Sequence, residues 1–123
     1  MSNPKVLLID DEEELVMTLV ERLAFRNIDA TAEMDGHSAL ERIQREKFDL
    51  VIADMKMPGL GGLEVAAILR ERYPDVKILL ITGHGLLDEE KDMNVDGVSD
   101  ILIKPFSIDV LIAAINKALE SEL

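Results

Sequence analysis

Four short runs of aliphatic residues constrain the fold of this chain more than any other feature. They lie near residues 5–10, 50–53, 78–81 and 101–103, and polar residues do not alternate within them. Uninterrupted apolar runs are typical of parallel strands that are covered on both faces. Residues 28–32 alternate apolar and polar side chains instead, which fits the edge of a sheet. The pattern therefore predicts a parallel sheet that is buried on both sides.

Amphipathic segments that favour helices separate these runs. One apolar stripe consists of Leu15, Val16, Leu19, Val20 and Leu23. A second consists of Leu63, Ala66, Ala67 and Leu69-Arg70, and it stops before Tyr73-Pro74. Ser107 can cap a last helix with the inner face Leu111, Ala114, Ile115 and Ala118. The mixed segment 86–96 is also expected to be helical.

The order of elements is then five repeats of a strand followed by a helix. This order predicts the α/β class, with right-handed crossovers and helices on both faces of the sheet. At 123 residues without an obvious linker, the chain is expected to be one domain, residues 1–123, with no effector segment. One Tyr, three Phe and no Trp mean that its core is mainly aliphatic.

Charge and cysteine content exclude several classes of function. Lys and Arg total 13 against 25 Asp and Glu, so the formal net charge is -12. Such a chain repels the phosphate backbone of nucleic acids, and cations or basic partner surfaces are better candidates. Absent cysteine rules out disulfides and thiol catalysis and fits a reducing cytoplasm. The first residues show neither a signal peptide nor a membrane span, so we expect a cytoplasmic location.

Polar side chains follow four of the five predicted strands at the point where each strand ends. Asp10 and Asp11 follow the first run, Asp54 the run 50–53, Thr82 the run 78–81 and Lys104 the run 101–103. The carboxyl ends of parallel strands meet at one edge of a sheet, where ligands of this fold class bind. These side chains are therefore expected to form one site.

The composition of this predicted site indicates phosphoryl chemistry. Neighbouring carboxylates raise the pKa of one another unless a cation lies between them, and Mg2+ prefers such oxygen ligands. A carboxylate beside Mg2+ can act as a nucleophile toward a phosphoryl group. The ammonium of Lys104 and the hydroxyl of Thr82 would then stabilise the phosphoryl oxygens. Of the acidic run 10–14, we expect that only Asp10 and Asp11 face the site.

With these motifs the chain resembles the receiver domain of two-component response regulators. The matching stretches are Leu8-Ile9-Asp10-Asp11-Glu12, Asp54-Met55-Lys56-Met57-Pro58-Gly59, Ile81-Thr82-Gly83 and Lys104-Pro105-Phe106. The resemblance implies a flavodoxin-like, doubly wound sheet in the order 2-1-3-4-5. It also implies phosphoryl transfer from a histidine kinase, or a phosphotransfer protein, to Asp54.

The resemblance further implies individual residue roles. Asp11 and Asp54 would bind Mg2+ directly, Asp10 would act through a water, and the backbone carbonyl of Lys56 would be a further ligand. Lys104 would contact the phosphoryl group and Thr82 would move toward it. The side chains of Lys56 and His84 would tune the lifetime of the aspartyl phosphate. The bond between Lys104 and Pro105 would be cis.

The switch position, Ile101, departs from the pattern of the family. Ile101 stands where an aromatic residue usually changes rotamer as the Thr moves, and its branched side chain cannot make the same ring movement. We expect the response in the face near residues 83–119, with segment 83–96 as its movable part. A downstream effector and a homodimer through residues 88–119 are further expectations.

Two other functions remain open from the sequence. A receiver-like interaction module could work without phosphorylation, and the missing aromatic at Ile101 is its support. A Mg2+-dependent phosphohydrolase would use the same nucleophile, but it needs a substrate pocket or cap, and no insertion is long enough to build one.

Overall fold

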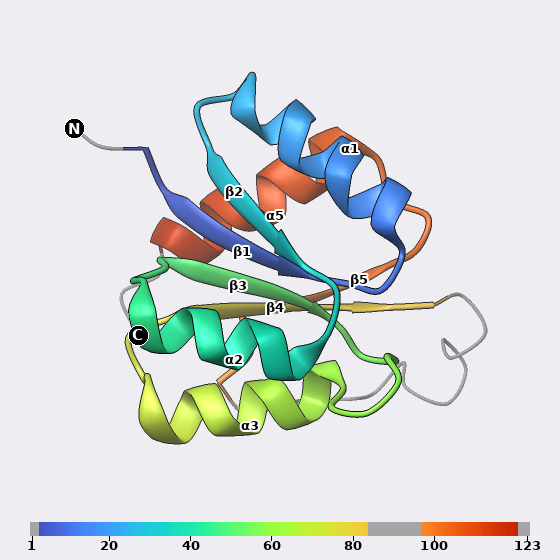
Figure 1. The fold of residues 1–123 in the computed structure, drawn as a ribbon. Helices are drawn as coiled ribbons and strands as arrows, with labels where there is room; N and C mark the ends of the chain where they lie inside the picture. The colour runs from blue at the N-terminus through green and yellow to red at the C-terminus, as the bar shows by residue number, and fades with distance from the viewer. Residues whose placement is uncertain (1–2, 84–96, 121–123) are drawn as a thin grey trace.

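The computed structural model describes residues 3–83 and 97–120. In this part the elements are β1 (Lys5–Ile9), α1 (Glu13–Ala24), β2 (Asp29–Glu33), α2 (Gly36–Arg45), β3 (Leu50–Asp54), α3 (Gly62–Arg72), β4 (Lys77–Thr82), β5 (Asp100–Ile103) and α5 (Ile108–Glu120). The strands pair in parallel in the order β2-β1-β3-β4-β5 (Figure 1). The predicted fold class and strand order are confirmed.

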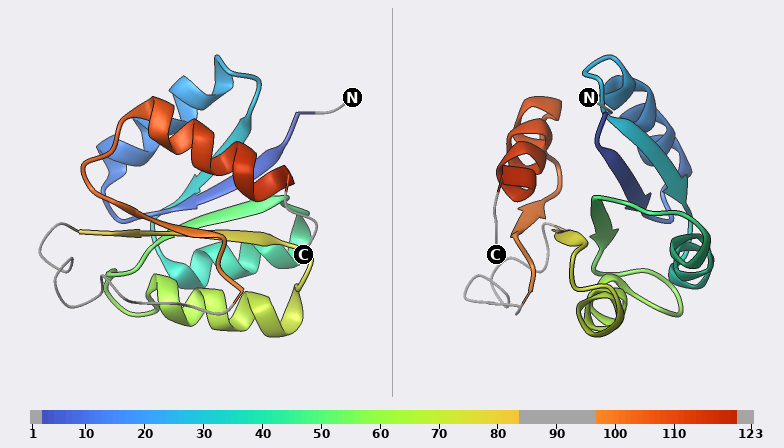
Figure 2. Two further views of the ribbon diagram at one scale, coloured as in Figure 1. Left: turned by 180° about the vertical axis from the view of Figure 1, so that it is seen from behind. Right: turned by 90° about the vertical axis from the view of Figure 1, so that its left-hand side faces the viewer.

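Helices cover both faces of the sheet. Helices α1 and α5 lie on one face, and α2 and α3 lie on the other (Figure 2). Successive strand residues point to opposite faces, so the two cores take alternate members of β1, β3, β4 and β5. In β4, Leu79 packs with the α1 and α5 side, whereas Leu80 packs with the α2 and α3 side. This arrangement explains why these four strands lack an alternating pattern, which only the edge strand β2 shows among the described strands.

Several local predictions are confirmed by the described residues. Strand β2 lies at the edge of the sheet and is only partly buried. The four predicted inner residues of α5 are all buried, and the Ser107 hydroxyl accepts a hydrogen bond from the backbone N–H of Val110 at 3.1 Å. The expected helix at 86–96 lies outside the described residues. No helix in the described ranges is long and apolar enough to cross a membrane.

The predicted inner face of α3 was partly wrong. Val65, Ala66 and Leu69 are buried, whereas Leu63 and Ala67 are exposed. The cause lies at the start of the helix, where a Cβ on Gly62 would come within 2.5 Å of the backbone oxygen of Asp54. This close approach turns the Gly62 side of α3 toward β3. Positions three, four and seven residues later then face inward.

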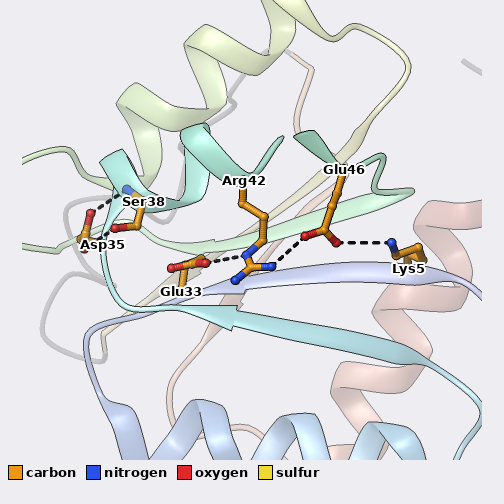
Figure 3. Close-up of polar contacts among 6 residues, drawn as sticks. All are labelled: Lys5, Glu33, Asp35, Ser38, Arg42 and Glu46. Carbon is orange, nitrogen blue, oxygen red and sulfur yellow. Dashed lines mark hydrogen bonds and ion pairs between the residues drawn. The ribbon is translucent and has the colours of Figure 1, made fainter. Parts of the chain in front are cut away.

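A chain of ion pairs ties α2 to the two strands beneath it (Figure 3). The guanidinium of Arg42 contacts Glu33 at 2.5 Å and Glu46 at 2.7 Å, and Glu46 also contacts the ammonium of Lys5 at 3.4 Å. The contact with Arg42 is the main cause that lowers the pKa of the Glu46 carboxyl. These partly exposed pairs position α2 and add little stability individually.

Asp35 caps the N-terminus of α2 (Figure 3) and is expected to make its contribution to stability pH-dependent. Its carboxylate accepts hydrogen bonds from the backbone N–H of Ser38 at 2.8 Å and from the Ser38 hydroxyl at 3.1 Å. These bonds, the backbone one first, lower the pKa of Asp35 below 3.8. A lowered folded-state pKa stabilises the fold above the unfolded pKa, and the benefit is lost as pH falls through the folded value.

Asp35→Asn tests this expectation because asparagine caps helices about as well as aspartate but carries no charge. We expect the wild type to exceed the variant in unfolding free energy at neutral pH, and the difference to shrink as pH falls below 3.8. Urea unfolding across this range measures the difference. Glu21→Gln removes an exposed carboxylate from α1 and controls for net charge. A difference that stays constant with pH would contradict the expectation.

Candidate functional site

The register of the sheet brings the predicted site residues to one edge. Ile9 pairs with Ala53, so Asp10 and Asp54 each follow paired positions of β1 and β3. Thr82 pairs with Ile103, and Lys104 is the next residue after β5. Asp10, Asp54 and Thr82 are also the buried polar residues among the described part of the chain. Four strand ends therefore supply one polar cluster.

Local backbone contacts fix the position of Asp54. The backbone N–H of Lys56 donates to Asp54 Oδ1 at 3.1 Å, which turns the chain directly after β3. The N–H of Met55 donates to the carbonyl of Ile81 at 2.7 Å and holds this turn against β4. On the other side Gly62, at the start of α3, lies against the carbonyl of Asp54. The carboxylate is thus set at the strand end by contacts from three segments.

Lys104 joins three carboxylates in this cluster. Its Nζ lies 2.8 Å from Asp10 Oδ2 and 3.2 Å from Asp54 Oδ2. It also contacts the carboxylate of Glu12. The backbone N–H of Lys104 donates to the carbonyl of Thr82 at 2.9 Å, which fixes the base of its side chain beside β4. One ammonium therefore faces three negative charges, and the cluster as a whole is negative.

The charges in the cluster shift pKa values in opposite directions. Burial is the main cause that raises the pKa of Asp54, and the charge of Asp10 raises it further, against the Lys56 N–H and Lys104. For Lys104, burial alone would lower the pKa of the ammonium. Its contacts with Asp10, Glu12 and Asp54 outweigh burial and raise that pKa above its usual value. Lys104 is therefore held as a cation.

The same carboxylates fit a divalent cation. Asp10, Glu12 and Asp54 each offer an oxygen, and these oxygens lie within 4.8 Å of one another. Asp10 Oδ2 is buried and has no hydrogen-bond partner, although it forms the ion pair with Lys104. Three carboxylates that share the Lys104 ammonium keep a net negative charge, and oxygen donors of this kind are what hard cations such as Mg2+ prefer. The residues present thus fit a magnesium ion.

Comparison with known proteins decides the family. The family model for the response regulator receiver domain matches residues 6–116. The chain belongs to this family. As a receiver domain of the two-component type, it is a signalling domain rather than a classical enzyme.

Relatives of two kinds match the chain. The response regulator protein FleR of Pseudomonas aeruginosa is 35% identical over 108 residues, which cover 88% of this chain but 23% of FleR. The receiver protein CpdR of Brucella abortus is 34% identical over 115 residues, covering 94% of this chain and 96% of CpdR. The chain thus spans about a quarter of FleR but nearly the whole of CpdR.

Solved receiver structures have the same fold. The receiver domain of NtrX from Brucella abortus superposes with a TM-score of 0.86 at 28% identity, covering 95% of this chain and 99% of that one. A receiver domain protein from Clostridium thermocellum gives a TM-score of 0.85 at 29% identity, covering 94% of each chain. The similarity therefore extends over essentially the whole receiver domain.

The receiver fold brings together most of the residues that the sequence singled out. Lys104 contacts both Asp10 and Asp54, and Thr82 is buried at the same edge. The bond between Lys104 and Pro105 is cis, as expected. Asp11 is exposed and lies outside the group of converging oxygens, so its role as a direct ligand stays a prediction.

Three further predicted positions lie either outside this group of contacts or outside the described residues. Lys56 is exposed, and its backbone N–H faces Asp54. Ile101 is partly buried in the core on the α2 and α3 side of the sheet, opposite Leu80 of β4. His84 lies outside the described residues, as does nearly all of segment 83–96. The proposed roles of these positions stay predictions.

Sequence reasoning missed Glu12. We expected only the first two acids of the run 10–14 to face the site, but Glu12 contacts Lys104 and joins the oxygen cluster. The cause is a tight turn in which the N–H of Glu12 donates to Asp10 Oδ1 at 3.0 Å. Asp residues form such turns with the residue two positions later. That spacing indicates a turn at Asp10, but by itself it does not show that the Glu12 carboxylate reaches Lys104.

Proposed function

We propose that this receiver domain accepts a phosphoryl group on Asp54 in a Mg2+-dependent reaction. The donor would be a histidine kinase or a phosphotransfer protein. The observation that carries the proposal is the contact between the buried Asp54 carboxylate and the Lys104 ammonium at a strand end. A buried nucleophile beside a fixed cation is suited to a group that gains negative charge during transfer.

The residues of the chain have distinct tasks in this reaction. A bond forms between a carboxylate oxygen of Asp54 and phosphorus as the bond from phosphorus to the donor breaks. Lys104 then offers its ammonium to the phosphoryl oxygens, and it is already within 3.2 Å of Asp54 Oδ2. The Lys56 N–H orients the other carboxylate oxygen, Oδ1. Thr82, from the neighbouring strand, supplies a hydroxyl group at the same edge.

Magnesium would be held by Asp10 and Asp54, with Asp11 and the backbone carbonyl of Lys56 as further candidate ligands. When bound, it would neutralise negative charge on the carboxylates and on the phosphoryl oxygens. Asp10 Oδ2 supports this assignment because it is a buried carboxylate oxygen that shares its counter-charge, the Lys104 ammonium, with Asp54 and Glu12. Charge balance supports it as well, because three carboxylates surround a single ammonium.

The output of the domain is proposed in general terms. Relatives such as FleR are about four times as long as the matched region, which supports an effector beyond a receiver of this kind. CpdR, which the chain nearly spans, supports a receiver that acts on a separate partner. In either case the face near residues 83–119 would transmit the change, and its β5 and α5 part exposes Ile103 and Val110 for contact with a partner or a second copy.

Incubation with Mg2+ and acetyl phosphate tests the proposal. We expect intact-protein mass spectrometry to show one phosphoryl adduct on the wild type and none on Asp54→Asn. Without Mg2+ the adduct should be lost or strongly reduced, because the charge of the cluster then opposes the donor. Acyl phosphates are cleaved by hydroxylamine, which identifies the bond.

Asp75→Asn is the matched control because Asp75 is an exposed aspartate just before β4. It therefore lies near the amino end of that strand, whereas the site lies at the carboxyl ends. This variant should form the adduct as the wild type does. Wild type that forms no adduct would contradict the proposal and favour a module that works without phosphorylation. Continuous turnover of the donor without an adduct would instead indicate a phosphohydrolase.

A further inference from the structure

Lys104 and a bound metal ion would compete for the same carboxylates. Its ammonium lies 2.8 Å from Asp10 and 3.2 Å from Asp54, the two buried carboxylates of the cluster. A divalent cation bound by these carboxylates would repel the ammonium strongly, because the repulsion acts at short range in a poorly solvated site. Binding of the cation therefore requires Lys104 to move away from them.

Glu12 differs from the other two carboxylates in a way that suits it to receive Lys104. Its side chain is 58% exposed, whereas those of Asp10 and Asp54 are 3% and 10% exposed. The Glu12 carboxylate already contacts the ammonium from the solvent side. An ammonium that moves outward from the inner pair would keep this contact and would not enter solvent alone.

The backbone of Glu12 is held by hydrogen bonds, whereas its exposed side chain can move with the Lys104 ammonium. The N–H of Glu12 donates to Asp10 Oδ1 at 3.0 Å, and its carbonyl accepts from the N–H of Val16 at 3.1 Å in the first turn of α1. These bonds hold the base of the side chain beside the cluster. The exposed carboxylate can then shift together with the ammonium.

We propose that Glu12 is a positioning residue that holds the Lys104 ammonium at the mouth of the site when Mg2+ takes the inner carboxylates. The inference rests on the proposed function, since it concerns the same metal and the same lysine. Glu12 thereby eases the entry of the cation and keeps Lys104 within reach of a phosphoryl group on Asp54. The phosphoryl oxygens would then replace Glu12 as the partner of Lys104.

A double-mutant cycle on Mg2+ affinity tests this role without any phosphodonor. Isothermal titration calorimetry gives the Mg2+ dissociation constant for the wild type, Glu12→Gln, Lys104→Met and the double variant. We expect Glu12→Gln to weaken Mg2+ binding about fivefold, the ratio that matches one exposed ion pair. In the Lys104→Met background the same change should alter the constant by less than about twofold, because no ammonium needs a partner.

Equal weakening in both backgrounds would overturn the proposal, because Glu12 would then act on the cation directly. No weakening in either background would overturn it as well. Glu13→Gln removes an equal charge from the next residue, which is exposed in the first turn of α1, and should leave the constant unchanged.

Glu12→Asp gives a second test that stands if Lys104→Met fails to fold, as circular dichroism would show. Aspartate keeps the charge but shortens the reach to Lys104, so Mg2+ binding should weaken as it does for Glu12→Gln. A dissociation constant equal to that of the wild type would show that charge alone matters and would overturn the proposal. The Mg2+ dissociation constants could follow the expected cycle while the protein forms no adduct on Asp54. That result would contradict the proposed phosphotransfer and would leave the role of Glu12 standing.

Discussion

Leu79→Ala and Leu80→Ala are each expected to lower the free energy of unfolding by about 2–5 kcal/mol. Both side chains are fully buried in β4, at 0% exposure. They point to opposite faces of the sheet, so each variant opens a cavity in a different core. A sheet covered on one face only would tolerate one of the two substitutions. The two results together therefore test whether both faces of the sheet are packed against helices.

Urea unfolding followed by far-ultraviolet circular dichroism measures both changes. Ile103→Ala is the matched control, because Ile103 is an aliphatic residue of β5 that is 37% exposed. Its substitution is expected to cost less than about 1 kcal/mol. If either leucine variant were as stable as the Ile103 variant, one face of the sheet would not be a packed core.

The strands could be predicted because their apolar runs are unambiguous. Each predicted strand overlaps an observed one and its boundaries differ by one residue at most. In β1, β3, β4 and β5, cover on both faces leaves no polar residue inside the strand, whereas the edge strand β2 alternates. The rotation of α3 could not be predicted in the same way. Leu63 and Val65 are equally apolar, and the choice between them depends on how closely Gly62 approaches Asp54.

In the site, residues at strand ends could be predicted, whereas a residue that depends on distant contacts could not. Asp10, Asp54 and Lys104 come at or directly after the ends of strands, so topology alone brings them to one edge. Glu12 belongs to a run of five acids, and composition cannot select among them. Its role depends on a turn at Asp10 and on a contact with Lys104, which is 92 residues away in the chain. Such a contact exists only once the sheet is assembled.

Lys104→Met is expected to change phosphorylation and metal binding in opposite directions. Formation of the adduct on Asp54 should slow by about 10–100-fold, the ratio that matches one hydrogen bond to a charged group of about 1.5–3 kcal/mol. Mg2+ should bind more tightly than in the wild type, because the ammonium that contacts Asp10 and Asp54 is gone. Timed mass spectrometry at saturating Mg2+ gives the rate, and calorimetry gives the affinity.

The opposite signs separate a role of Lys104 in the reaction from a role in folding. A misfolded variant would lose both adduct formation and Mg2+ binding. Removal of the Lys104 ammonium from a folded protein would instead raise the affinity for Mg2+. Lys117→Met, which removes an exposed lysine from α5, should change neither quantity. If Lys104→Met formed the adduct at the wild-type rate, the ammonium would serve only to balance the acidic cluster. Tighter Mg2+ binding with slow phosphorylation would instead show that one side chain both restrains the metal site and stabilises the phosphoryl group.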